Sequence, residues 1–537
     1  MTPAKRVCVI GAGPSGLASA RQMLDEGFLV VMYDMSDTVG GLWAYTELQE
    51  EGKASVMRNT IMNTSKEMSA FSDFPPPPES ANYMHNKAML SYFQSYSKHF
   101  DLGKCFQPNK EVIRVKQDEN FVETGRWHVV LRHTKTGVES QEIFDAVMIC
   151  IGHHVYPHMP NFPGQENFKG TIVHTHSVKE ADDFKNQRVV VVGLGNSAGD
   201  AAVEIGNVAS QVYLSTRRGG WVMKRVGPNG IPRDLTAITR LNNYAQRILP
   251  ESFISGKVED MLNAAFDHEA YGLKPKHRFH QQHPTTNDEI PNKILSGQIM
   301  VKGRIVGFTS EGVLFEGEQQ VTPVDAVVLG TGYEFKFPFL PESIVPVHEN
   351  RVRLYKYVIP PDLPHPTLAV IGLVQPLGPI FPVAEMQARW FAHLLGGKIR
   401  LPQTTEMHRD INAKQEAVDK RFVPSLRHTL EMNWVDGMDA MASEIGACPN
   451  LVKYFFTDQA LFWKLVLGPA VPYQYRLEGP HAWKGARDAI FGVRARIVAP
   501  LNKSQKWFTG EESASRTVCI MIGLLFIALA YVLCRYC

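Results

Sequence analysis

Two glycine-rich stretches have the residue types and spacing that suit the binding of a diphosphate group. In such a loop the first glycine makes a tight turn, the second lets the backbone approach the diphosphate, and the third allows close helix–strand packing. The N-terminus of the following helix adds free N–H groups and a partial positive charge. The first stretch is Gly11, Ala12, Gly13, Pro14, Ser15 and Gly16, and the second is Gly193, Leu194, Gly195, Asn196, Ser197, Ala198 and Gly199, followed by Asp200. Each stretch predicts one bound dinucleotide.

The residue that ends the next strand differs between the two stretches. Asp34 lies about 20 residues beyond the first, where a carboxylate can bind ribose hydroxyls. Arg217 and Arg218 follow the second, and arginine suits the 2′-phosphate of NADP through charge and paired hydrogen bonds. The alternative for the two arginines is an ordinary pair of surface charges. The difference predicts two distinct cofactors, FAD in the first site and NADPH in the second.

Further residues are assigned to the cofactor sites. The pair Gly40–Gly41 would let the backbone pass close to the flavin, and Trp43 would lie near it. The remaining residues predicted to bind a cofactor are Leu42, Met62, Asn63, Thr64 and Gln375.

The elements that must position these residues form two βαβ units. Apolar β-branched strands at 7–10 and 188–192 precede the glycine loops, helical patterns follow, and second strands end at residues 34 and 216. The stretches 145–157 and 325–335 each read as a strand that returns to a sheet, which places the NADPH unit inside the FAD unit. We therefore expect an α/β protein with two Rossmann-type dinucleotide-binding domains, a helical insert and a C-terminal membrane helix.

The expected domain boundaries follow from these patterns. The FAD domain comprises 1–153 and 331–445, and the NADPH domain comprises 154–220 and 296–330. A helical insert at 221–295 would cover the active site, because a long ordered insertion is usually functional. A membrane-associated region, 446–516, and a transmembrane tail anchor, 517–537, complete the chain. Packing of 446–516 against the catalytic domains is the alternative.

Composition excludes several classes of function. The chain has 537 residues and a formal charge of +2, which gives no reason to expect nucleic acid as a partner. Seven scattered cysteines form no CxxC pair, so neither a disulfide framework nor a redox dithiol is expected. The histidines of "HRFHQQH", at 277, 280 and 283, lack the partners and spacing of a metal site. We expect no metal.

The C-terminal stretch is apolar all round. Residues 518–534 contain no charged residue, Pro, Asn or Gln, and this length meets the lower limit of about 17 residues for crossing a bilayer core. A buried helix of a soluble core is the alternative. No signal peptide precedes the first strand, so we expect catalytic domains in the cytosol and a single tail anchor.

The chain resembles the animal flavin-containing monooxygenases of the microsomal, xenobiotic-metabolising kind over nearly its whole length. The resemblance is carried by GAGPSG, GGLW, NTSKEMSAFSDFP, MHN, VVVVGLGNSAGD, STRRGGWVMKRVG, PTTNDEIPNKILSG, LGTGY, GLVQPLGPIFPVAEMQARW and GPAVPYQYRLEGP. One signature of the wider class, FxGxxxHxxx followed by an aromatic and a basic residue, is incomplete. Phe168, Gly170, His174 and Lys179 fit it, whereas Val178 replaces the aromatic.

The resemblance implies a reaction and a site. NADPH would reduce FAD, the reduced flavin would form a C4a-hydroperoxide with O₂, and one oxygen would pass to a soft nitrogen or sulfur of a small lipophilic amine or sulfide. Asn63 matches the family's active-site asparagine, where a neutral amide can donate a hydrogen bond to the flavin peroxide or to NADP. The alternative for Asn63 is a cap on a following helix. For His174 a structural role is favoured.

Three functions remain open at this point. The favoured one is the oxygen-transferring monooxygenase, on the endoplasmic reticulum membrane. An H₂O₂-releasing NADPH oxidase or a Baeyer–Villiger monooxygenase would use the same cofactors, and a non-enzymatic membrane adaptor would keep only the fold. Intact glycines, Asp34 and the arginine pair argue against the adaptor. The sequence does not fix the oligomeric state, for which a homodimer is one option.

Overall fold

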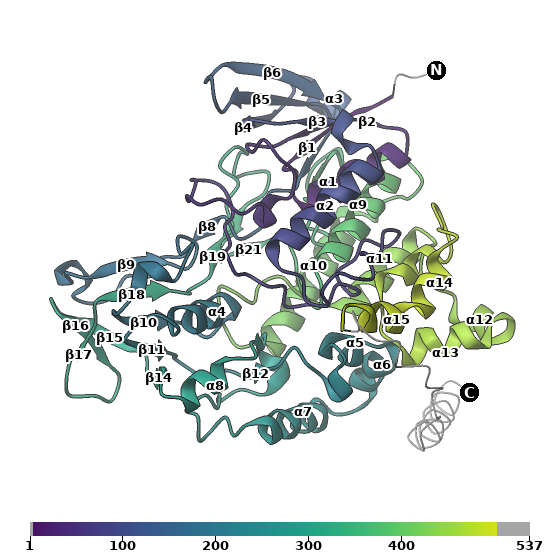
Figure 1. Ribbon diagram of the computed structural model, residues 1–537. Coiled ribbons are helices and arrows are strands. Elements are labelled where there is room, and N and C mark those ends of the chain that lie inside the picture. Colours follow the sequence, from purple (N-terminus) through teal and green to yellow (C-terminus); the bar gives the residue numbers. More distant parts are fainter. Residues whose placement is uncertain (1–3, 502–537) are drawn as a thin grey trace.

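Two five-stranded parallel sheets form the centre of the computed structural model, which describes residues 4–501 (Figure 1). The first sheet has the order β22 (Leu368–Val370), β7 (Ala146–Ile149), β1 (Arg6–Ile10), β2 (Leu29–Tyr33), β3 (Phe106–Gln107). The second has the order β9 (Thr171–His174), β18 (Ala326–Leu329), β10 (Arg188–Val192), β11 (Gln211–Ser215), β14 (Ile299–Lys302). All neighbouring strands in both are parallel. The expectation of an α/β protein with two Rossmann-type sheets is confirmed.

The second sheet lies between two strands of the first along the chain. All its strands fall within 171–329, whereas the first sheet uses strands up to residue 149 and one from 368. The chain crosses between the sheets twice, and the crossings pair as β8 (Tyr156–Pro157) and β19 (Tyr333–Glu334). The residue boundaries assigned to the domains remain predictions.

Each sheet carries one antiparallel excursion and one crossover helix after its glycine loop. The excursions are β4 (Lys110–Gln117), β5 (Trp127–His133) and β6 (Glu139–Phe144), and β15 (Ile305–Phe308), β16 (Gly312–Phe315) and β17 (Thr322–Pro323). The crossover helices are α1 (Pro14–Asp25) and α4 (Asn196–Ile205). Helix α1 packs against the wholly buried α9 (Phe381–Leu395), so the first glycine loop sits over the largest apolar core.

The stretch that interrupts the second unit is largely helical, as its sequence pattern indicates. It contains β12 (Val222–Met223), α5 (Arg233–Ala237), α6 (Arg240–Ile248), α7 (Glu251–Ala265) and β13 (Thr285–Thr286), and α8 (Ile290–Leu295) leads back to the sheet. Strands β12 and β13 pair in parallel and close the base of this insert.

The remaining elements complete the first unit and the C-terminal region. They are α2 (Asn86–His99), α3 (Phe121–Thr124), β20 (Val347–His348), β21 (Arg351–Val352), β23 (Gln375–Leu377), α10 (Thr404–Arg421), β24 (Glu431–Asn433), α11 (Trp434–Glu444), α12 (Leu451–Thr457), α13 (Gln459–Leu467), α14 (Ala486–Phe491) and α15 (Val493–Val498).

The C-terminal region packs onto the catalytic part and also exposes apolar side chains. Tyr473, Tyr475 and Arg476 are buried, and Arg476 bonds Glu385 at 2.9 Å. On α12, Phe456 is 77% exposed. Among residues 4–501 no helix is long and apolar enough to cross a bilayer. The predicted anchor, 517–537, lies outside the described residues.

Candidate active site

Both glycine loops open onto one large cavity between the sheets. The cavity has a volume of about 2890 Å³, well above the ~300–1,000 Å³ of a typical site for one small molecule. Its walls come from both sheets, from the insert and from the segment 424–435. The volume therefore suits two large ligands that meet.

The first loop has a backbone shaped for a diphosphate. Gly11 has a φ of +101°, and a Cβ there would lie 2.6 Å from the carbonyl oxygen of Cys150. Gly13 precedes α1 without a side-chain cap, so the first N–H groups of the helix remain available. Gly41 approaches so closely that a Cβ on it would lie 2.9 Å from the Cα of Gly13. These contacts form the cradle that a flavin dinucleotide requires.

Most, but not all, of the predicted cofactor residues line the cavity. Ala12, Gly16, Gly40 and Gly199 do not. A Cβ on Gly16 would lie 1.8 Å from the Gly11 carbonyl oxygen, and one on Gly199 would lie 3.0 Å from Ile290. Gly16 and Gly199 therefore serve packing behind the loops, while the other predicted residues of both sites face the cavity.

Two predicted polar ligands are already bonded to the protein. One Asp34 oxygen accepts from the Ala12 N–H at 2.7 Å, and the other accepts from the Ser36 N–H at 2.8 Å. A carboxylate has further lone pairs, so Asp34 can still accept from a ribose. The Asn196 amide oxygen accepts from the Thr286 N–H at 2.8 Å and so ties the second loop to the insert.

Arg217 and Arg218 lie at the open end of β11, on the cavity wall and exposed. Arg218 reaches only the Pro424 carbonyl, at 3.4 Å, and Arg217 has no hydrogen bond or ion pair within residues 4–501. Two such cations at the strand end are available to a 2′-phosphate.

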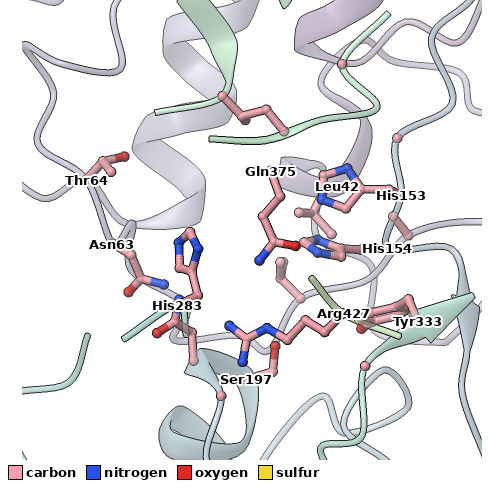
Figure 2. Close-up of a pocket in the computed structure, with 18 of the residues that line it drawn as sticks. Leu42, Asn63, Thr64, His153, His154, Ser197, His283, Tyr333, Gln375 and Arg427 are labelled. Carbon is pink, nitrogen blue, oxygen red and sulfur yellow. The ribbon is translucent and has the colours of Figure 1, made fainter. Parts of the chain in front are cut away.

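Asn63 lies on the opposite wall of the cavity, with Thr64 beside it (Figure 2). Its amide oxygen accepts from Arg225 Nη2 at 2.7 Å, whereas its Nδ2 has no partner among the described residues. No helix begins after it, so it does not act as a helix cap. The arrangement leaves an N–H donor facing the cavity.

The insert holds Arg225 in this position. Asp288 bonds Arg225 Nη1 at 2.8 Å and the Arg225 N–H at 2.9 Å, and Arg225 Nε donates to the Met62 carbonyl at 3.1 Å. Arg225 follows β12 and Asp288 follows β13, so the pairing of these strands sets the clamp. Sequence reasoning missed both residues.

Asp234 supports the same loop from α5. It accepts from the Ser65 N–H at 2.6 Å, and its other oxygen is buried without a partner within residues 4–501. Burial raises the pKa of the Asp234 carboxyl to about 6. Burial likewise raises the pKa of Asp200 to about 6, although Asn287 donates to it at 3.0 Å.

A third wall is rich in aromatic and imidazole groups. Figure 2 shows His153, His154 and Tyr333 on one side of the hollow, with Gln375 and Arg427 reaching in. Burial lowers the pKa of His153 to about 4, so this imidazole is neutral at physiological pH. His174 packs against Tyr333 and accepts from the His176 N–H at 3.1 Å, which supports its structural role.

The aromatic that the wider class carries at position 178 is replaced by a well-packed residue. Val178 is 3% exposed and belongs to the same buried cluster as Met57, from the FAD-side segment. Lys179 donates to Ser55 at 2.5 Å, and its carbonyl accepts from the Arg58 N–H at 2.9 Å. The motif therefore joins the two nucleotide-binding units.

Within residues 4–501, no group of His, Cys, Asp or Glu side chains is placed to hold a metal ion. Of the histidines at 277, 280 and 283, only His280 and His283 face the cavity. His283 lies 3.4 Å from Glu431.

Comparison with known proteins identifies the family. The profile of the family described as "Flavin-binding monooxygenase-like" matches residues 4–534. Flavin-containing monooxygenase 5 of Cavia porcellus is 45% identical over 528 residues, covering 98% of each chain. Dimethylaniline monooxygenase [N-oxide-forming] 2 of Mus musculus is 43% identical over 530 residues, also covering 98% of each.

Solved structures share the fold. S-allyl-L-cysteine S-oxygenase from Allium sativum matches with a TM-score of 0.63 at 24% identity, covering 92% of this chain and 98% of that one. An oxidized steroid monooxygenase bound to NADP matches with a TM-score of 0.57 at 17% identity, covering 82% and 97%. With its two glycine loops opening onto one cavity, the chain belongs to the flavin-binding monooxygenase-like family and is a flavoprotein that uses FAD and NADPH.

Proposed function

We propose that this protein uses NADPH and O₂ to transfer one oxygen atom to soft nitrogen or sulfur atoms of small lipophilic molecules. The observation that carries the proposal is the neutral Asn63 donor, held by Arg225 at 2.7 Å where the walls of the two cofactor sites meet. The relatives' names, which include an N-oxide-forming enzyme, support the same class of substrate.

The protein's own residues bind and orient the cofactors and shield the cavity. When bound, NADPH supplies a hydride and FAD carries the reaction with O₂. The uncapped N-termini of α1 and α4 would hold the two diphosphates, and the Asn63 N–H would donate a hydrogen bond toward the reacting centre. The insert contributes apolar side chains such as Ile238 and Leu262 to the cavity wall, which favours lipophilic substrates.

One assay separates the three candidate reactions. Purified protein with FAD, NADPH and air is incubated in parallel with a tertiary amine, a sulfide or a ketone. The amounts of NADPH oxidised, product formed and H₂O₂ released are measured in each case. We expect N-oxide or S-oxide close to the NADPH consumed. H₂O₂ equal to NADPH would make the protein an oxidase, and ester from the ketone would make it a Baeyer–Villiger enzyme.

We further propose attachment to the endoplasmic reticulum membrane by the tail at 517–537, with the catalytic part on the cytosolic side. Exposed apolar residues near the point where the described chain ends support this placement. They lie on α12 at the right of Figure 1 and on α6 and α7, which follow along its lower side: Val452, Phe455, Phe456, Ile248, Leu249 and Phe253 (Figure 1). Such a surface suits contact with the headgroup region of a bilayer.

A further inference from the structure

Arg427 lies inside the cavity, and its guanidinium has no ion-paired protein partner among residues 4–501. It lies in the segment between α10 and β24, and Figure 2 shows its guanidinium reaching toward Ser197 at the start of α4. Within residues 4–501 its guanidinium makes no hydrogen bond or ion pair. Two other arginines that line the cavity are paired, Arg225 with Asp288 at 2.8 Å and Arg304 with Glu316 at 2.9 Å.

This isolation is unfavourable in the absence of an anion. Taking a charge out of water is costly unless an opposite charge or hydrogen bonds replace the water. Burial lowers the pKa of the Arg427 guanidinium from its ordinary value, which reflects that cost. Glu431 contributes an attraction across space, yet its carboxylate contacts His283 instead, at 3.4 Å.

The guanidinium faces the backbone of the second glycine loop. A Cβ on Gly195 would lie 3.1 Å from Arg427 Nη1, so glycine at this position leaves room for the arginine as well as for a ligand. Gly195 is also the N-cap of α4 and provides no side-chain cap, which leaves the N–H groups of that helix available. Two separate sources of positive potential therefore converge on one place.

We propose that Arg427 binds the diphosphate of NADPH from outside the second sheet, opposite the N-terminus of α4. The inference rests on the proposed use of NADPH and assigns different phosphates to different arginines. The exposed Arg217 and Arg218 take the 2′-phosphate, and Arg427 takes the diphosphate. Bidentate contact between a guanidinium and phosphate oxygens supplies both charge and geometry.

Equilibrium binding to the FAD-loaded, full-length protein tests the assignment without turnover. The ligands are NADP⁺, which carries both phosphate groups, and adenosine 2′-phosphate, which lacks the diphosphate. The variants are Arg427→Gln, Arg427→Lys and Arg217→Ala, with Arg304→Gln as the matched control. Arg304 also lines the cavity, but its side chain is 56% exposed and paired with Glu316.

We expect Arg427→Gln to weaken the binding of NADP⁺ roughly tenfold to hundredfold, because a charged hydrogen-bonding group is lost. The affinity for adenosine 2′-phosphate should stay unchanged. The NADP⁺ affinity of Arg427→Lys should lie between those of the unmodified protein and Arg427→Gln, because lysine keeps the charge but cannot make the bidentate contact of a guanidinium. Arg217→Ala should weaken the binding of both ligands, whereas Arg304→Gln should weaken the binding of neither.

Unchanged NADP⁺ affinity in Arg427→Gln would overturn the proposal. Equal weakening of both ligands in Arg427→Gln and Arg427→Lys would also overturn it, because Arg427 would then support the fold or the adenosine end. Failure of the unmodified protein to bind NADP⁺ would instead refute the proposed function. Bound FAD, measured by absorbance, identifies a variant that has lost its fold.

Discussion

The guanidinium of Arg225 donates to the amide oxygen of Asn63 at 2.7 Å, across 162 residues of sequence. Because the oxygen is occupied, the amide can turn only its N–H face to the cavity. A residue of the insert thus sets the polarity of a side chain that belongs to the FAD-side wall. The position of the insert therefore determines which side of the Asn63 amide faces the cavity.

Asn63→Asp should uncouple NADPH oxidation from product formation. The new carboxylate would pair with Arg225, so the loop should hold, but an ionised carboxylate has no N–H to donate. Loss of one donor at a developing charge costs ~10²–10³ in rate in acyl-transfer enzymes, which sets the scale here. NADPH consumption should persist while product falls and H₂O₂ rises. Asn59→Asp, which removes an amide bonded to Glu204, is the control; loss of FAD in Asn63→Asp would point to a structural role.

Asp288→Asn should produce a milder form of the same defect. Without the ion pair at 2.8 Å, Arg225 is held less firmly and the Asn63 amide is freer to rotate. A net loss of about 1 kcal/mol, or roughly fivefold in the ratio of product to H₂O₂, is the expected size. NADP⁺ affinity should stay unchanged. Asp419→Asn breaks a surface pair with Arg351 and should leave the ratio intact; a drop in both variants would contradict the clamp.

Arg217→Ala should reduce the preference for NADPH over NADH. Arg217 is exposed, and we assign it to the 2′-phosphate, which NADH lacks. We expect the KM for NADPH to rise roughly tenfold or more while that for NADH changes little. Steady-state rates measured over a range of NADPH and of NADH concentrations give the two KM values. An equal rise for both would remove the 2′-phosphate assignment.

Asp234→Asn should stabilise the protein at neutral pH. The pKa of Asp234 is about 6 in the folded protein against an ordinary 3.8, so the folded state binds this proton more tightly than the unfolded chain. Stability is therefore lost as pH rises from about 4 through 6, and the charged form remains unfavourable above 6. The asparagine should add about 1–2 kcal/mol at pH 7.5, within the ~3 kcal/mol of a full two-unit shift.

Thermal unfolding of both proteins at pH 5.0 and 7.5 measures this difference. The gain in Tm from Asp234→Asn should be larger at pH 7.5 than at pH 5.0. The exposed Asp183→Asn is the control and should give equal values at both. A gain that is independent of pH would exclude Asp234 ionisation as the cause.

Removal of residues 517–537 should release an FAD-containing protein from membranes. The exposed apolar residues on α12 and α7 should then give a weaker, salt-independent association with vesicles. Phe456→Ser, at a side chain that is 77% exposed, should weaken that residual binding without lowering Tm. Sedimentation with phosphatidylcholine vesicles provides the measurement, and full retention of the truncated protein on membranes would refute the single-anchor proposal.

Local patterns identified much of this architecture. The strands before Gly11 and Gly193, the helices after them and the helical insert all follow from apolar periodicity and glycine spacing within about 30 residues. Helix α4 begins at Asn196, inside the glycine loop, and its N-cap, Gly195, makes no side-chain cap. The N–H groups of its first turn are therefore available to a phosphate.

The site residues that could not be predicted from the sequence are positioned by long-range contacts. Asp234 reaches Ser65 across 169 residues, and Arg427 faces Gly195 from a segment with no recognisable motif. Nothing near these residues distinguishes them from ordinary surface charges. Asn196, predicted as a cofactor ligand, lines the cavity, and its amide oxygen also accepts a hydrogen bond from the Thr286 N–H of the insert, which the sequence did not indicate.

The paired crossings β8 and β19 give the second sheet two covalent attachments to the first, joined as Tyr333 opposite Pro157. The two crossings run in opposite directions and pair with one another, so the chain enters and leaves the second sheet at one point of attachment. A single protease cut in either crossing would also leave the halves connected by the other, so a nicked enzyme would separate only on denaturation.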